Sequence, residues 1–126
     1  PEMSRGLGDV YKRQVTAGEA SVIGISDGKR YRLRLRDIFY FEIVEGRSFL
    51  YCEDRVFECR QKLYEFETLC RGSMLFRCSK SMILNTDKIA CVRPSVSGRF
   101  EATLVNQEKV IISHQYVGEL KRMLGI

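Results

Sequence analysis

Three short polar segments of this sequence combine a cation or an amide with small hydroxyl groups. They read Gly46-Arg47-Ser48, Arg77-Cys78-Ser79-Lys80-Ser81 and Ser113-His114-Gln115. Arginine and lysine can donate to phosphate or to guanine acceptors, glutamine can pair with adenine, and serine can donate to phosphate. Each segment adjoins a strand-like apolar run, where loops carry function on a rigid scaffold. The pattern favours nucleic-acid chemistry if the segments meet in space, and three ordinary surface loops if they do not.

Catalytic chemistry has few residues available. His114 is the only histidine of the chain, so nucleophilic catalysis by serine or cysteine would have to use it. It directly follows Ser113, and adjacent residues cannot easily form a nucleophile–base pair that also faces a substrate. The sequence contains neither G-x-x-x-x-G-K-[ST] nor G-x-G-x-x-G, the glycine-rich loops that cradle phosphates. We therefore expect no enzymatic activity and no bound cofactor.

The cysteines indicate free thiols rather than a metal site or disulfides. There are five, and no two are spaced C-x-x-C: Cys52, Cys59, Cys70, Cys78 and Cys91. With a single histidine, this spacing argues against zinc. Most occupy apolar positions, which predicts buried structural thiols in a reducing cytoplasm. Cys78 is the alternative case, because Arg77 and Lys80 could lower its pKa and make it a redox-sensing thiol.

Length and composition describe one globular domain. The chain has 126 residues, of which 44% are hydrophobic and 29% charged. This is enough for one buried core, and it excludes collagen, a coiled coil and a mainly disordered chain. No stretch approaches the roughly 20 apolar residues that span a bilayer, so we expect no membrane partner. The net charge of +5 permits a phosphate-rich partner without demanding one.

The N-terminal residues resemble a translated synthetic DNA sequence. The segment SRGLGDVYKRQ at positions 4–14 is similar to a translated transposase-based sequencing adapter. We therefore expect residues 1–14 to be adapter-derived and disordered, and we exclude them from fold reasoning. The alternative is an ordinary polar arm. We then expect residues 15–28 to form a linker and a first hairpin, and the natural N-terminus to be truncated. A receiver domain or another upstream domain could have been lost with it.

The apolar pattern of the remaining residues predicts many short strands and two short helices. Residues 31–36 alternate apolar side chains with arginines, as in a half-buried strand whose arginines form its solvated face. Asp27-Gly28 before this run favours a tight hairpin. Residues 62–70 change to helical spacing, and Ser113 is a good N-cap for a closing helix. Further strand-like runs lie at 21–25, 38–44, 49–52, 56–59, 75–78, 82–84, 89–92, 100–105 and 109–112.

Four ordered segments resemble the LytTR DNA-binding domain of bacterial transcription regulators. They are LRDIFYFE (35–42), like the family's D-I-x-Y-x-E strand; LYEFE (63–67); FRCSKSMILN (76–85), like F-x-R-x-H-R-S-x-x-V-N; and ISHQYV (112–117), like the S-R-x-Y close. The resemblance covers residues 29–126. It implies an elongated, mainly antiparallel β-sheet or sandwich fold with two short helices. It also implies loops that enter major grooves of double-stranded DNA at paired direct repeats, with a homodimer on DNA as one arrangement.

The resemblance further implies which residues meet DNA. Base contacts fall near Arg47 and Ser48, on Lys80 and on Gln115. Lys80 stands where the family has arginine, and it lacks the bidentate fork of arginine. His114 replaces another family arginine, so we expect a different target sequence. The complete set of predicted DNA-binding residues is Arg47, Ser48, Arg77, Ser79, Lys80, Ser81, Ser113, His114 and Gln115.

Two other functions stay open on the sequence. The same loops could serve a β-rich module that binds protein or RNA. Cys78 could serve a thiol redox sensor. Strong salt dependence without preference among duplex sequences would favour the first alternative, and an accessible thiol of low pKa would favour the second.

Overall fold

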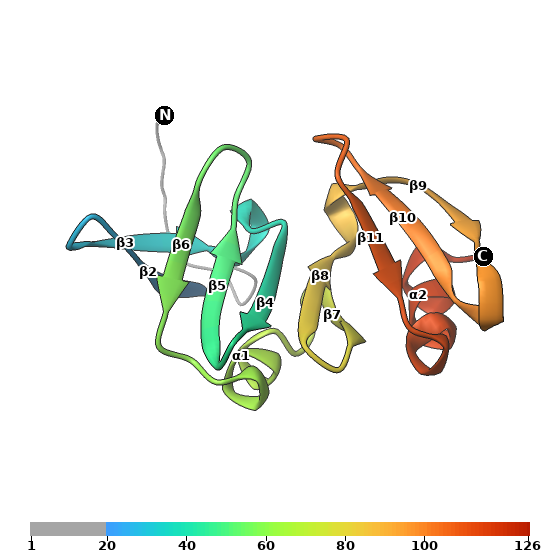
Figure 1. Cartoon of the computed structure of the whole chain (residues 1–126), viewed down its shortest axis with the longest axis horizontal. Coiled ribbons are helices and arrows are strands. Elements are labelled where there is room, and N and C mark those ends of the chain that lie inside the picture. The colour runs from blue at the N-terminus through green and yellow to red at the C-terminus, as the bar shows by residue number, and fades with distance from the viewer. Residues whose placement is uncertain (1–19) are drawn as a thin grey trace.

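A computed structural model describes residues 20–126 of the chain (Figure 1). The prediction for residues 1–14 lies outside the described residues. So does the part of the prediction for residues 15–28 that covers residues 15–19. The strands are β2 (Ser21–Ser26), β3 (Lys29–Arg34), β4 (Tyr40–Val44), β5 (Arg47–Tyr51), β6 (Val56–Cys59), β7 (Leu75–Ser79), β8 (Met82–Asn85), β9 (Ile89–Pro94), β10 (Phe100–Leu104) and β11 (Lys109–Ile112). The helices are α1 (Leu63–Leu69) and α2 (Val117–Leu124).

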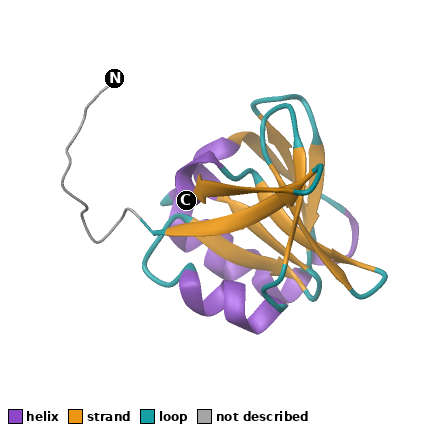
Figure 2. Cartoon of the chain, turned by 90° about the vertical axis from the view of Figure 1, so that its left-hand side faces the viewer, coloured by secondary structure: helices purple, strands orange, loops and turns teal. Residues whose placement is uncertain are grey.

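Within residues 20–126, two antiparallel sheets follow one another along the longest axis of the view (Figure 1). The larger sheet has seven strands in the order β3-β2-β6-β5-β4-β8-β7, and the smaller has three in the order β11-β10-β9. Seen from the side in Figure 2, the strands cross at large angles and helices pack against them toward the lower edge of the view. The expected fold class, mainly β and antiparallel with two short helices, is confirmed.

Several element ends differ from the sequence-based expectation. The alternating run at 31–36 was expected to be strand throughout, but β3 ends at Arg34 and a 3-10 turn follows at Leu35–Asp37. The strand expected from residue 38 begins at Tyr40. Ser113 does not cap the closing helix α2 with its side chain, which makes no capping hydrogen bond, and a 3-10 turn, His114–Tyr116, lies between Ser113 and α2. The backbone N–H of Ser113 instead donates to the Cys78 carbonyl of β7 at 2.9 Å.

Two hydrophobic cores lie on either side of the β7–β8 hairpin. The first lies under α1, where Phe41 and Phe66 are fully buried and stack with ring centroids 4.5 Å apart. The second packs the smaller sheet and α2, and it includes the fully buried Leu104 and Leu120. The hairpin supplies side chains to both cores, with Ile83 in the first and its neighbour Leu84 in the second. Because both of its faces are packed, the hairpin holds its own turn in a fixed position.

Candidate nucleic-acid interface

The three predicted polar segments lie along one edge of the molecule, at the bottom of Figure 1. The β4–β5 turn and the β7–β8 turn share this end because β4 pairs antiparallel with both β5 and β8. Ile43, which pairs with Ser48, donates its N–H to the Ser81 carbonyl at 2.9 Å. The Ser113–Cys78 hydrogen bond then links the third segment to the second. We call residues 47–48, 77–81 and 113–115 the loop edge.

Arg77 holds the β7–β8 turn from within. Its Nε donates to the Ser79 carbonyl at 2.6 Å and its Nη2 to the Lys80 carbonyl at 2.9 Å. Its Nη1 donates to the Glu67 carboxylate of α1 at 3.2 Å, and the guanidinium lies over the Tyr116 ring at 5.7 Å. One side chain thus joins the turn, α1 and the segment after β11.

The turn presents Lys80 at its tip. The register of β7 against β8 shifts between Arg77 and Ser79, and such bulges change the direction of a strand end. The Ser79 hydroxyl accepts from the Ser81 N–H at 3.2 Å. Lys80 is exposed, whereas Ser79 and Ser81 are half-buried. The two serines therefore shape the turn, and the lysine is its accessible cation.

Arg47 and Ser48 differ in accessibility. Ser48 is only 8% exposed, and its hydroxyl donates to the Gln61 carbonyl at 2.7 Å. Arg47 is exposed and forms two hydrogen bonds with the Glu58 carboxylate, at 2.7 and 3.0 Å. These hydrogen bonds and the opposite charges raise the pKa of Arg47 and lower that of Glu58. Ser48 therefore supports the turn, and Arg47 is a pre-aligned cation beside it.

The third segment offers two exposed side chains. His114 and Gln115 are exposed, and Ser113 is half-buried. The 3-10 turn that contains them begins at the β7 contact of Ser113 and leads directly into α2. The structure therefore brings residues 77–81 and 113–115 into contact. Residues 47–48 lie on β5, which is separated from the β7–β8 hairpin by β4.

Comparison with known proteins identifies the family. The sequence matches the family described as the LytTr DNA-binding domain over residues 28–125. This chain belongs to the LytTR family. It is 26% identical over 96 residues to the sensory transduction protein LytT of Enterococcus faecalis, covering 76% of this chain and 40% of that protein. The chain thus spans less than half the length of this curated relative.

A solved LytTr DNA-binding domain from Bacillus cereus has the same fold. The TM-score is 0.79 at 23% sequence identity, and the alignment covers 86% of this chain and all of the solved chain. The resemblance drawn from the four sequence segments is confirmed. Membership in a family of DNA-binding domains favours a binding role over catalysis.

Cys78 of this LytTR domain is unsuited to redox sensing. Its side chain is fully buried, and burial raises the pKa of the thiol to about 12. The positive charge of Arg77 lowers this pKa, but the effect of burial is larger. The expectation that Arg77 and Lys80 could activate the thiol is therefore wrong. The expectation of burial is also wrong for Cys91, which is exposed on β9.

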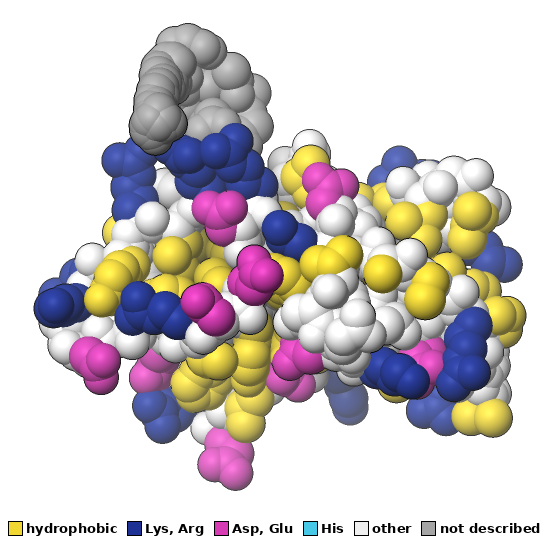
Figure 3. Space-filling view, turned by 90° about the horizontal axis from the view of Figure 1, so that it is seen from above, with side chains coloured by type: hydrophobic (Ala, Val, Ile, Leu, Met, Phe, Trp, Pro, Cys, Tyr) yellow, Lys and Arg dark blue, Asp and Glu magenta, His cyan; other side chains and the backbone are white. Residues whose placement is uncertain are grey.

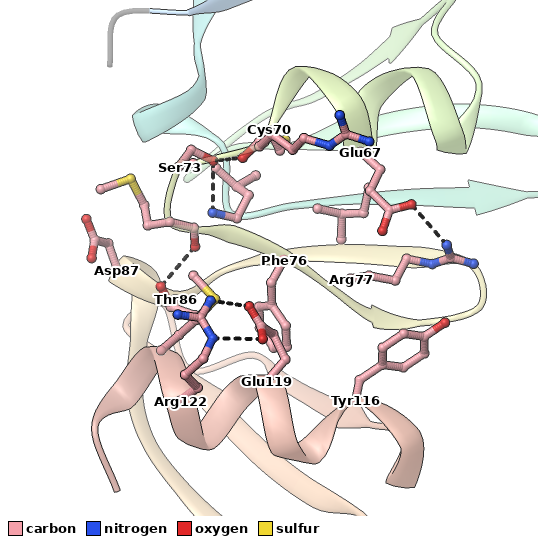
Figure 4. A pocket seen from close by; sticks show the side chains of 16 residues that line it. Glu67, Cys70, Ser73, Phe76, Arg77, Thr86, Asp87, Tyr116, Glu119 and Arg122 are labelled. Atoms are coloured by element: carbon pink, nitrogen blue, oxygen red, sulfur yellow. Dashed lines mark hydrogen bonds and ion pairs between the residues drawn. The ribbon is translucent and has the colours of Figure 1, made fainter. Parts of the chain in front are cut away.

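A pocket of about 800 Å³ lies behind the loop edge, between α1, β7 and α2 (Figure 4). Arg77 and Tyr116 line it on the side of the loop edge, and Glu119 pairs with Arg122 on α2. The Arg77–Glu67 ion pair spans the space between β7 and α1. The pocket walls therefore include the same side chains that fix the β7–β8 turn.

Metal and membrane sites receive no support from residues 20–126. Within that range, no group of three or more His, Cys, Asp or Glu side chains could hold a metal ion. No helix there is long and apolar enough to cross a membrane.

Sequence reasoning missed the partners that fix these side chains. They are Glu58 for Arg47, Gln61 for Ser48, and Glu67 with Tyr116 for Arg77. Each partner lies at least ten positions from the residue it holds. The Glu67 and Tyr116 positions had a signal in the sequence, since each lies within a segment of the family resemblance.

Proposed function

We propose that this LytTR domain recognises specific sequences of double-stranded DNA through its loop edge, as part of a bacterial transcription regulator. The arrangement of Arg77 is the observation that carries the proposal. By bonding both carbonyls of the turn, Arg77 holds Lys80 exposed at the tip before any ligand arrives. A turn whose backbone is already positioned loses less entropy on binding than a mobile one.

The residues of the loop edge divide into readers and supports. Lys80 and Gln115, together with the Arg47 turn, read base edges in the major groove. His114 and the backbone amides after Ser113 contact phosphates, which fix the register of a protein on the duplex. Arg77, Ser48, Ser79 and Ser81 hold these groups in place.

The DNA partner we propose is a pair of direct repeats. A homodimer assembled on the DNA is the corresponding arrangement of the protein. This function requires the domain to act where the bacterial chromosome lies, in the cytoplasm. Because the Enterococcus relative is named a sensory transduction protein, we propose that an upstream signal controls this domain as well.

A selection from a random duplex library tests the proposal. The whole chain is used as bait at two salt concentrations. We expect enrichment of a short motif, especially as a spaced repeat. Retention of all duplexes without enrichment, falling steeply with salt, would contradict sequence recognition. Preferential binding of RNA would favour the interaction-module alternative.

Lys80→Ala then tests the role of the exposed lysine. If Lys80 reads a base, the substitution costs about 1–3 kcal/mol on the selected site and relaxes the preference at one position. An equal loss on every duplex would instead make Lys80 a phosphate contact.

A further inference from the structure

The imidazole of His114 rests against the loop between β9 and β10. A Cβ atom placed on Gly98 would lie 2.9 Å from His114 Cδ2 and 3.3 Å from both Cγ and Nε2. These distances are shorter than van der Waals contact, so the ring occupies space that only glycine leaves open. The backbone agrees, because Gly98 has φ +73° and Ser97 before it has φ 59°. Two successive left-handed residues turn this loop toward His114.

The loop is closed before any ligand binds. The Ser95 N–H donates to the Arg99 carbonyl at 2.8 Å, and the Arg99 N–H donates to the Val96 carbonyl at 3.2 Å. In Figure 1 the loop lies at the lower right, beside the segment that follows β11. The β9–β10 loop therefore lies next to the third segment of the loop edge, and its own hydrogen bonds fix its conformation.

Arg99 supplies a cation to this loop. Its side chain is exposed, and its Nε donates to the Val96 carbonyl at 3.3 Å. Glu101, the nearest acid along the chain, is engaged by Arg93 at 2.7 Å. Since a guanidinium has five N–H donors, Arg99 can keep this bond and still donate to a phosphate.

We propose that residues 95–99 form a fourth DNA-facing element, in which Arg99 contacts a phosphate and Gly98 positions His114 for its own phosphate contact. This inference rests on the proposed function and adds a loop that the sequence patterns did not mark. Gly98 is a positioning residue here, and Arg99 is a binding residue.

Arg99→Gln tests the phosphate contact on the duplex obtained by selection. The affinity of the whole chain is measured at about 50 and 200 mM salt. Loss of one phosphate contact reduces the salt slope by about 0.9. The ratio of wild-type to variant affinity should therefore be about 3-fold larger at the lower salt, with an unchanged preference among sequences. Equal affinities and slopes for both proteins would overturn the contact.

Gly98→Ala tests the positioning role. We expect it to displace the ring and to weaken DNA binding as much as His114→Ala does, with no further loss in the double variant. The matched control is Gly28→Ala, because Gly28 has the same φ of +73° but nothing within 4 Å of an added Cβ. The control experiences the same backbone strain and should bind DNA normally. Full additivity of Gly98→Ala and His114→Ala, or wild-type binding by Gly98→Ala, would overturn the positioning role.

The two proposals fail in different ways. If the wild-type chain shows no sequence preference, the proposed function is wrong and this inference is wrong with it. If the wild-type chain selects a sequence and the Arg99 and Gly98 variants bind it equally well, only the fourth element is wrong. Arg99→Gln alters an exposed side chain, so it decides the phosphate contact of Arg99 even if Gly98→Ala fails to fold. His114 is exposed as well, so wild-type binding by His114→Ala would then overturn the positioning role.

Discussion

Two basic regions of this molecule differ in how their cations are held. On the loop edge, Arg77 bonds two carbonyls and a carboxylate, and Arg47 is paired with Glu58. On β3, Arg30 and Arg32 are exposed at alternate positions, opposite Ile25 and Ile23 of β2. The first region surrounds its two arginines with partners from other elements, and the second displays its arginines from a single strand.

The difference shows that charge alone does not mark a binding site. Ordering a free arginine side chain costs about 2 kcal/mol of rotamer entropy, so a cation fixed in advance binds with less loss. β3 is also one of the two edge strands of the larger sheet. Charged side chains on such a strand discourage other chains from pairing with its open edge. From above, the basic side chains form separate groups interrupted by acidic and hydrophobic ones (Figure 3).

The largest effect is expected from Arg77→Ala. Because three hydrogen bonds are lost, we expect the free energy of unfolding to fall by about 1–3 kcal/mol. DNA binding should weaken by more than about 10-fold on the selected site, since the turn and its base-reading lysine both lose their position. Denaturant unfolding and DNA titration measure the two effects.

Arg77→Lys is the control for the charge. Lysine keeps the positive charge but lacks the planar fork that reaches several acceptors at once. We expect binding nearly as weak as in Arg77→Ala. Wild-type binding by Arg77→Lys would show that the charge matters rather than the clamp, and the contrast with β3 would lose its basis.

Local patterns predicted much of the fold. The Asp27-Gly28 turn has φ values of 52° and 73°, as the hairpin signal required. The spacing of Leu63 and Phe66 predicted α1, whose Phe66 is fully buried. These features depend on neighbours within a few positions, which is why a single sequence contains them.

The partners within the loop edge could not be predicted in the same way. The contact of Arg77 with Glu67 and Tyr116 depends on how β7 packs between two helices. Cys78 is instructive because a local signal did exist. Phe76 and Cys78 alternate with Arg77 along β7 and are both buried. The period of the strand indicates an inward thiol at this position, and the effect of burial on its pKa outweighs that of the nearby positive charge.

A smaller effect is expected from Ser48→Ala. The lost hydrogen bond to the Gln61 carbonyl should lower the free energy of unfolding by about 1 kcal/mol. The sequence preference of DNA binding should stay the same, because the hydroxyl faces the protein. Thermal unfolding and a repeat of the duplex selection check this. A changed preference with unchanged stability would make Ser48 a reader rather than a support.

The smallest effect on DNA binding is expected from the double substitution Arg30→Gln and Arg32→Gln on β3. Charges beyond about 8–10 Å are largely screened at physiological salt, so affinity for the selected duplex should change by less than about 2-fold. A loss as large as that of Lys80→Ala would mean that β3 itself contacts a polyanion, and the two regions would then share one function. If the arginines instead protect the edge of the sheet, the double variant should self-associate at high concentration, as measured by light scattering. The matched double variant Arg30→Lys and Arg32→Lys keeps the positive charge and should self-associate no more than the wild type. This control separates edge protection by charge from any specific role of the guanidinium.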